Sequence, residues 1–146
     1  MQDTIAKYDT IDYQHPEYLA ATDTFYANFL TRKKWPRNST PKECEGSGGF
    51  NDKIYNYMWG PTEFKATGSL KGFERVEQLH SIQKPVLFIG GQYDEVLPQT
   101  INHYQSLVKG AKSIITPSAG HSQLGDNPTF YTKAISEFMK GVEMEM

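Results

Sequence analysis

The sequence has little of what marks several large classes of protein. It contains one cysteine, Cys44, which excludes an internal disulfide and a cysteine-built metal site. Lysine and arginine number 15 against 17 aspartate and glutamate, so the basic surplus typical of nucleic-acid binding is missing. No apolar run approaches the roughly 18 residues of a membrane span, and the N-terminus lacks the pattern of a signal peptide. These absences predict a soluble, cytoplasmic protein.

The histidines also lack a pattern that would predict a metal site. His15, His80 and His103 are scattered along the chain without the spacing of metal ligands. We therefore expect no metal and no other cofactor. Aromatic residues, in contrast, make up 13% of the chain, and many of them fall in its first 75 residues. Such side chains can line a pocket or an interface, although an ordinary core uses them too.

The pattern of the chain changes at Pro85. Before it, residues 17–34 have the spacing of a helix with an aromatic face, residues 38–49 form a polar loop, and residues 50–60 indicate a short helix. After it, the sequence predicts, in order, a buried strand over 86–89, a helix over 98–108, a strand over 112–116 and a helix over 128–139. This alternation is typical of an α/β fold with a parallel sheet.

Two parallel strands leave both outer edges of their sheet unpaired. An α/β domain therefore needs more strands than this sequence supplies. Either the helical first half contains further strands, or the chain is the end of a longer protein.

An acid and a histidine follow the two predicted strands. Asp94 comes just after the first strand and the turn made by Gly90 and Gly91, and His121 lies in the loop PSAGHS after the second. Because functional groups in open α/β sheets sit beyond the carboxyl ends of the strands, we expect these two side chains to meet. A carboxylate that holds one ring nitrogen leaves the other free to act as a general base. The simpler alternative is that Asp94 caps a helix and His121 is a surface loop residue.

Longer stretches of the sequence resemble a known family. PVLFIGGQYDEVLP and GAKSIITPSAGHSQLGDNP resemble the end of an α/β-hydrolase, where an acid follows one late strand and the histidine follows the next. EYLAATDTFYANFLTRKKWP and YNYMWGPTEFKATGSLKGFERVEQL resemble the cap and its return segment in the prolyl iminopeptidases. The resemblance divides the chain into a helical cap segment over 1–84 and a C-terminal part of the α/β-hydrolase core over 85–146.

The resemblance implies a serine hydrolase that releases N-terminal proline from short peptides. Asp94 and His121 would be two members of its catalytic triad. Glu63 matches a cap glutamate that pairs with the free α-amino group of the substrate, unless it is an exposed or helix-capping carboxylate. The cap would also contribute apolar side chains to the wall of the substrate pocket, and the candidates are Phe25, Tyr26, Phe29, Tyr57, Met58 and Trp59.

The nucleophile of such an enzyme is not evident. The family carries a Gly-x-Ser-x-Gly sequence before its cap, and this chain has none. The nearest imitation is Ser47 in EGSGG, but Glu45 stands in place of the first glycine and no strand precedes it, so a flexible loop is the better interpretation. We therefore interpret the chain as a C-terminal fragment of the family fold that is inactive alone.

Other functions remain open from the sequence. A different α/β-hydrolase, such as an esterase or an epoxide hydrolase, would share the strand motifs. A non-catalytic module would use its unpaired sheet edge to self-associate. We expect either a homodimer or pairing with the missing N-terminal half, a short peptide with a free N-terminus as the substrate, and no nucleic-acid or membrane partner.

Overall fold

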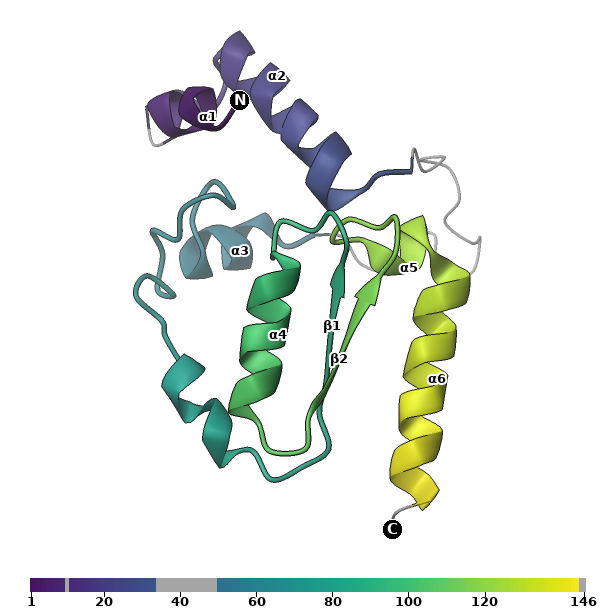
Figure 1. The fold of residues 1–146 in the computed structure, drawn as a ribbon. Helices are drawn as coiled ribbons and strands as arrows, with labels where there is room; N and C mark the ends of the chain where they lie inside the picture. Colours follow the sequence, from purple (N-terminus) through teal and green to yellow (C-terminus); the bar gives the residue numbers. More distant parts are fainter. Residues whose placement is uncertain (10, 34–49, 145–146) are drawn as a thin grey trace. The chain divides into compact units, whose positions relative to one another are not determined.

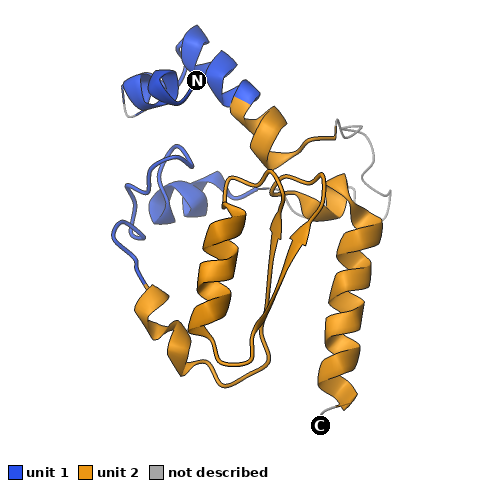
Figure 2. Cartoon of the chain, in the orientation of Figure 1, with its two compact units in different colours: residues 1–24, 35–74 blue, residues 25–34, 75–146 orange. Residues whose placement is uncertain are grey.

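A computed structural model describes residues 1–9, 11–33 and 50–144. The chain divides into two compact units (Figure 2). Unit 1 consists of residues 1–24 and 35–74, and unit 2 consists of residues 25–34 and 75–146. Helix α2 (Pro16–Phe25) runs from the first unit into the second.

Unit 2 is built on two parallel strands. Strand β1 (Leu87–Gly91) pairs with β2 (Lys112–Thr116), so that Leu87 lies opposite Lys112 and Gly91 opposite Thr116. Helix α4 (Pro98–Leu107) connects the strands, and its first residue is a proline, which suits the first turn of a helix. The short helix α5 (Gln123–Asp126) and the long helix α6 (Pro128–Met144) follow β2. The predicted strand–helix–strand–helix order is therefore confirmed.

The helices cover the two faces of this small sheet. In Figure 1, α4 and α6 lie on opposite sides of the strand pair. The buried apolar side chains of unit 2 come from α4, from the turn before β2, from the loop after it and from α6; they are Ile101, Val108, Ala111, Ala119 and Ala134. Because the two strands are parallel, their carboxyl ends lie at the same edge of the sheet, and the loops that follow them meet there.

Two details of the predicted first strand are wrong. Gly90 and Gly91 do not turn the chain but extend the strand, because they pair with Ile115 and Thr116 of β2. Leu87, Phe88 and Ile89 are half-buried instead of fully buried. Within the part of the chain that the structure describes, the sheet has two strands, so β1 pairs with β2 along one edge and has no strand partner along the other.

Unit 1 is made of short helices and turns. Helix α1 (Gln2–Tyr8), most of α2 and helix α3 (Asp52–Met58) are its regular elements. The side chain of Asn51 caps α3 by accepting a hydrogen bond from the Ile54 amide at 3.1 Å. Buried Tyr18 packs edge-on against Phe64, with ring centroids 6.5 Å apart.

The predicted helix over 17–34 ends earlier than expected. After Phe25 the chain widens into a π-helical turn, η1 (Tyr26–Leu30), and Thr31 is extended. A π-turn changes the direction of the backbone carbonyls at the end of a helix, and such turns occur frequently at functional sites. Other departures are minor: α6 reaches Met144 instead of residue 139, and a 3-10 helix, η3 (Val76–Ser81), precedes β1.

The short helix predicted over 50–60 is confirmed, but its apolar face is not buried. Phe50, Ile54 and Tyr57 are between 56% and 75% exposed. Within its own unit, then, α3 presents its apolar residues to solvent.

Candidate active site

Asp94 lies in the loop that follows β1, and its carboxylate is held by that loop. The side chain is 2% exposed. One carboxylate oxygen, Oδ2, accepts a hydrogen bond from the Gly91 amide at 3.2 Å, and Oδ1 accepts one from the Val96 amide at 2.9 Å. One backbone donor at the end of β1 and one in the following loop thus fix the orientation of a buried anion.

His121 lies in the loop that follows β2, and it meets Asp94. Its ring nitrogen Nδ1 is 3.1 Å from Asp94 Oδ1. A carboxylate can only accept in this contact, so Nδ1 donates, and in the neutral form of the ring Nε2 is the nitrogen that carries no proton. The His121 side chain is 53% exposed. The pair therefore combines a buried orienting acid with an imidazole that is open to a reaction partner, which is the arrangement of a general base.

A second carboxylate lies near the same ring. Glu95 Oε1 is 4.0 Å from His121 Nδ1, and the Glu95 side chain is 30% exposed. This separation is longer than a hydrogen bond, and solvent screens it. Asp94 is therefore the carboxylate that orients His121.

The two loops approach each other so closely that they require glycine at two positions. A Cβ on Gly91 would collide with the Gly120 carbonyl oxygen and lie 2.6 Å from that of Ala119. A Cβ on Gly120 would lie 2.5 Å from the Phe29 carbonyl oxygen. The acid loop, the histidine loop and η1 are consequently in backbone contact.

The end of η1 holds the histidine loop through backbone hydrogen bonds. The Phe29 carbonyl accepts from the His121 amide at 2.8 Å, and the Leu30 carbonyl accepts from the Ser122 amide at 2.7 Å. Carbonyls at the end of a helix have no intrahelical partner, so they are free to make these bonds. The π-turn that ends the predicted helix early therefore serves to position His121.

Sequence reasoning missed one charged residue of this site. Asp126, in α5, is 2% exposed. It accepts hydrogen bonds from the amides of Gly120, Arg32 and Lys33 at 2.8 to 3.0 Å. Burial alone would raise the pKa of Asp126, but the three donors and the charge of Lys33 outweigh burial and lower that pKa. A signal was available in the sequence, since Asp126 lies five residues after His121 and just before a Pro-initiated helix.

The cation Arg32 lies over the ring of Tyr93, next to Asp94. The guanidinium carbon is 4.0 Å from the ring centroid, and the same side chain donates to the Asn28 carbonyl at 3.0 Å. This stacking joins the segment after η1 to the acid loop a second time.

The predicted pocket-wall residues are divided between the two units. Phe25 and Tyr26 belong to unit 2 with the Asp94–His121 pair. The Phe25 ring lies 6.2 Å from that of Tyr26 and 5.0 Å from that of Phe29. All three residues are half-buried and form an aromatic cluster on the turn that holds the histidine loop.

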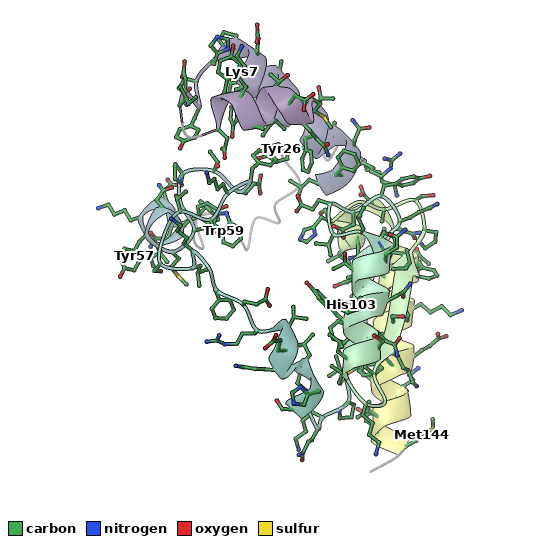
Figure 3. All side chains as sticks on the ribbon, turned by 60° about the vertical axis from the view of Figure 1, so that its left-hand side comes forward. Lys7, Tyr26, Tyr57, Trp59, His103 and Met144 are labelled. Carbon is green, nitrogen blue, oxygen red and sulfur yellow. The ribbon has the colours of Figure 1, made fainter. Side chains whose placement is uncertain are left out.

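Tyr57, Trp59 and Glu63 belong to unit 1. Figure 3 labels Tyr57 and Trp59, which come from α3 and the residue that follows it. Tyr57 is 75% exposed, whereas Trp59 is half-buried and its indole donates to the Glu63 carbonyl at 3.2 Å. The bond fixes the backbone of Glu63 beside Trp59, and the Glu63 side chain is half-buried.

Ser47, Cys44 and the rest of the polar loop lie outside the described residues. Among the residues that the structure does describe, no three histidine, cysteine or acidic side chains are grouped as a metal site would need. No helix in the described ranges is long and apolar enough to cross a membrane.

Comparison with known proteins shows which proteins this chain resembles. The chain matches no established family model. It is 35% identical over 126 residues to a proline iminopeptidase of Heyndrickxia coagulans, an alignment that covers 86% of this chain and 43% of that protein. It is 31% identical over 139 residues to a proline iminopeptidase of Saccharolobus solfataricus, covering 94% of this chain and 44% of that protein. The chain thus spans less than half the length of these relatives.

Solved structures give the same result for the fold. The structure of a proline iminopeptidase from Mycobacterium smegmatis superposes with a TM-score of 0.78 at 22% identity, over 99% of this chain and 48% of that one. The structure of VinJ superposes with a TM-score of 0.78 at 24% identity, over 97% and 48% of the two chains. The fold is that of part of an α/β-hydrolase, as predicted, and the predicted resemblance to the proline iminopeptidases is confirmed.

Proposed function

From this relationship to the proline iminopeptidases, we propose that the chain carries the acid and the histidine of a serine peptidase that releases N-terminal proline from short peptides. The observation that carries the proposal is the contact between His121 Nδ1 and buried Asp94 at 3.1 Å. The pair needs a nucleophile, and the chain contains no Gly-x-Ser-x-Gly sequence. In this proposal the nucleophile is a serine of the whole protein outside these 146 residues, so the chain alone is inactive.

The proposed chemistry follows from the tautomer. Asp94 accepts a hydrogen bond from Nδ1–H, so Nε2 of His121 is free to remove the proton of the serine hydroxyl as it attacks the peptide carbonyl. The imidazolium that forms is stabilised by the Asp94 carboxylate. Nε2 then gives this proton to the leaving amine, and water releases the acyl group by the same sequence of steps.

Glu63 is the proposed partner of the substrate's α-ammonium group. A half-buried carboxylate is partly shielded from water, which strengthens its attraction for a cation. An anionic partner of this kind distinguishes the end of a peptide chain from an internal peptide bond. Trp59 fixes the backbone at this position, and Phe25, Tyr26 and Tyr57 are the proposed apolar contacts of the prolyl ring.

The test is hydrolysis of proline β-naphthylamide by the whole protein and by two histidine variants. We expect His121→Ala to lower kcat by about 10²-fold or more, the usual contribution of a general base. The matched control is His103→Ala, which removes an exposed imidazole from α4 in the same unit. Equal activity in the wild type and in His121→Ala would refute the proposal, and hydrolysis of simple esters without hydrolysis of proline substrates would favour an esterase.

We also propose that the chain pairs through its sheet, either with a second copy or with the missing half of the fold. The support is the two-stranded sheet of the described residues together with a recess of about 210 Å³ beside it, lined mainly by Leu87, Ile114, Ala134 and Phe138. Light scattering after size exclusion measures the mass directly. A dimer is the expected result for the chain alone, and a monomer at all concentrations would contradict self-pairing.

A further inference from the structure

Asp126 is a buried charge to which the general-base chemistry assigns no role. Its carboxylate faces three backbone amides that come from two separate parts of the chain. Oδ2 accepts from the Gly120 amide at 2.9 Å and from the Arg32 amide at 3.0 Å, while Oδ1 accepts from the Lys33 amide at 2.8 Å. The donors are thus Gly120, the residue before His121, and Arg32 and Lys33 in the segment that follows η1.

These contacts complete a clamp around the histidine loop. On one side, the Phe29 and Leu30 carbonyls accept the amides of His121 and Ser122. On the other side, Asp126 binds the amide of Gly120 and the amides of the chain that continues from Leu30. The His121 and Ser122 amides are therefore bound directly to a segment about 90 residues away in sequence, and the Gly120 amide is linked to the same segment through the charged carboxylate of Asp126.

The chemistry of the contact requires a carboxylate. Three N–H donors converge on two oxygens, and an amide side chain has one oxygen and would turn an NH₂ group toward an amide donor. The three donors also keep the pKa of Asp126 low despite its burial. A buried anion with fully matched donors has a fixed geometry, and backbone groups bound to it are fixed as well.

We propose that Asp126 is a positioning residue for the general base: it holds the backbone at Gly120 so that His121 Nδ1 reaches Asp94. The proposal rests on the proposed function, because it gives Asp126 a role through His121. A purely structural role would instead lower the stability of unit 2 and leave the ring of His121 unchanged in the molecules that remain folded.

The experiment measures the tautomer of His121 in the chain by two-bond ¹H–¹⁵N correlation of the histidine rings at mildly alkaline pH. His121→Gln assigns the signal. The variants are Asp126→Asn, which is nearly isosteric, and Ala134→Gly, a control that destabilises α6 at its buried residue, away from the loop. We expect the wild type and the control to show the Nδ1–H tautomer, and Asp126→Asn to show a mixture of tautomers while the strand amides stay protected.

Kinetics of the whole protein provide the second reading. We expect Asp126→Asn to lower kcat by about 10²-fold with little change in KM, since a small misplacement of a catalytic group has an effect of this size. A folded Asp126→Asn variant with the wild-type tautomer and wild-type kcat would overturn the proposal. If the wild type itself lacks the Nδ1–H tautomer, the proposed function fails first, so the two failures are distinguishable.

A measurement on the wild type keeps the proposal testable if Asp126→Asn does not fold. Hydrogen exchange of the amides of Gly120, His121, Arg32 and Lys33 reports whether they open together. We expect one common opening, because all four depend on the same clamp. Free exchange at Arg32 and Lys33, with His121 still protected and its tautomer fixed, would overturn the proposal.

Discussion

The two units of the molecule hold their functional residues in different ways. In unit 2, Asp94 and His121 lie just beyond the ends of paired strands, and the η1 carbonyls and the Asp126 carboxylate accept hydrogen bonds that hold the loop carrying His121. In unit 1, Glu63 and Tyr57 lie on a short helix and a turn, and Tyr57 is largely exposed. The proposed catalytic pair thus lies in unit 2, whereas the proposed ammonium partner Glu63 lies in unit 1.

This difference leads to separate expectations for kinetics. Changes in unit 2 should act on kcat, because they displace the groups that transfer protons. Changes in unit 1 should act mainly on KM or on kcat/KM, because they remove contacts to a bound substrate.

The largest effect is expected from Asp94→Asn. The amide cannot hold the Nδ1–H tautomer as a carboxylate does, and its NH₂ group would face a backbone N–H. We expect kcat of the whole protein on proline β-naphthylamide to fall by about 10²- to 10⁴-fold with KM nearly unchanged. Circular dichroism of the variant checks that it folds. A kcat within a few-fold of the wild type would show that Asp94 does not support the chemistry.

Glu63→Gln should produce the next largest effect. It removes the negative charge of this one side chain and keeps the size of the side chain. A hydrogen bond to a charged group contributes roughly 1.5–3 kcal/mol, so kcat/KM should fall by about 10- to 100-fold. An N-blocked proline substrate, which has no ammonium group, is the control and should be insensitive to the change. An equal loss on both substrates would remove Glu63 from the ammonium site.

Gly120→Ala tests the backbone contact between the histidine loop and η1. The new Cβ would lie 2.5 Å from the Phe29 carbonyl oxygen, so the loop or the turn must move. Overpacking of this kind costs about 1–3 kcal/mol in the free energy of unfolding. Urea denaturation measures that loss, and the amide of His121 should lose its protection from exchange. If the variant kept the stability and the amide exchange of the wild type, the backbone at Gly120 would not be in close contact with the Phe29 carbonyl.

Acid should weaken unit 2 through Asp126. Its pKa in the folded chain lies below the ordinary value of 3.8, so the stability it contributes is complete above that pH and is lost as pH falls through the folded pKa. We expect the free energy of unfolding to decline below pH 3.8 in the wild type, and to decline less steeply in Asp126→Asn. Identical acid profiles would show that the donors do not favour the charged carboxylate.

The smallest effect is expected within unit 1. Burial raises the pKa of Tyr18 to about 12, and the charge of Asp9 adds to the shift. The neutral phenol therefore stabilises the fold fully below pH 10.0, and this contribution is lost as pH rises through about 12.

Tyr18→Phe removes the 3.3 Å hydrogen bond to Asp9 and should cost about 1 kcal/mol in the free energy of unfolding, measured by urea denaturation at neutral pH. We expect this variant to keep the kcat of the wild type. A large loss of kcat would contradict the expectation that changes in unit 1 leave kcat unaffected.

The sequence was most informative where strands determine geometry. The apolar run before Gly90 and the run KSIIT predicted two parallel strands, and their carboxyl ends had to bring Asp94 and His121 to the same edge. The structure brings these side chains into contact, as expected. Local pattern was sufficient there because strand periodicity and topology leave few alternatives.

The sequence was less informative where distant segments meet. The early end of the 17–34 helix at Leu30 depends on amides of His121 and Ser122, which are about 90 residues away and leave no local signal. Asp126 is a second example: its position five residues after His121 makes it a candidate, but its partners at Arg32 and Lys33 are recognised only after folding. The exposed face of α3 is a third example, because helical periodicity shows which residues share a face but not what covers it.

The most direct test of the Asp94–His121 pair is the tautomer of His121 in the wild-type chain, compared with Asp94→Asn by the same two-bond ¹H–¹⁵N correlation. A 3.1 Å contact between Nδ1 and a buried carboxylate requires the proton on Nδ1, so we predict the Nδ1–H tautomer in the wild type and its loss in the variant. A wild-type ring that carries its proton on Nε2, or one that does not respond to Asp94→Asn, would contradict the pairing and the general-base role built on it.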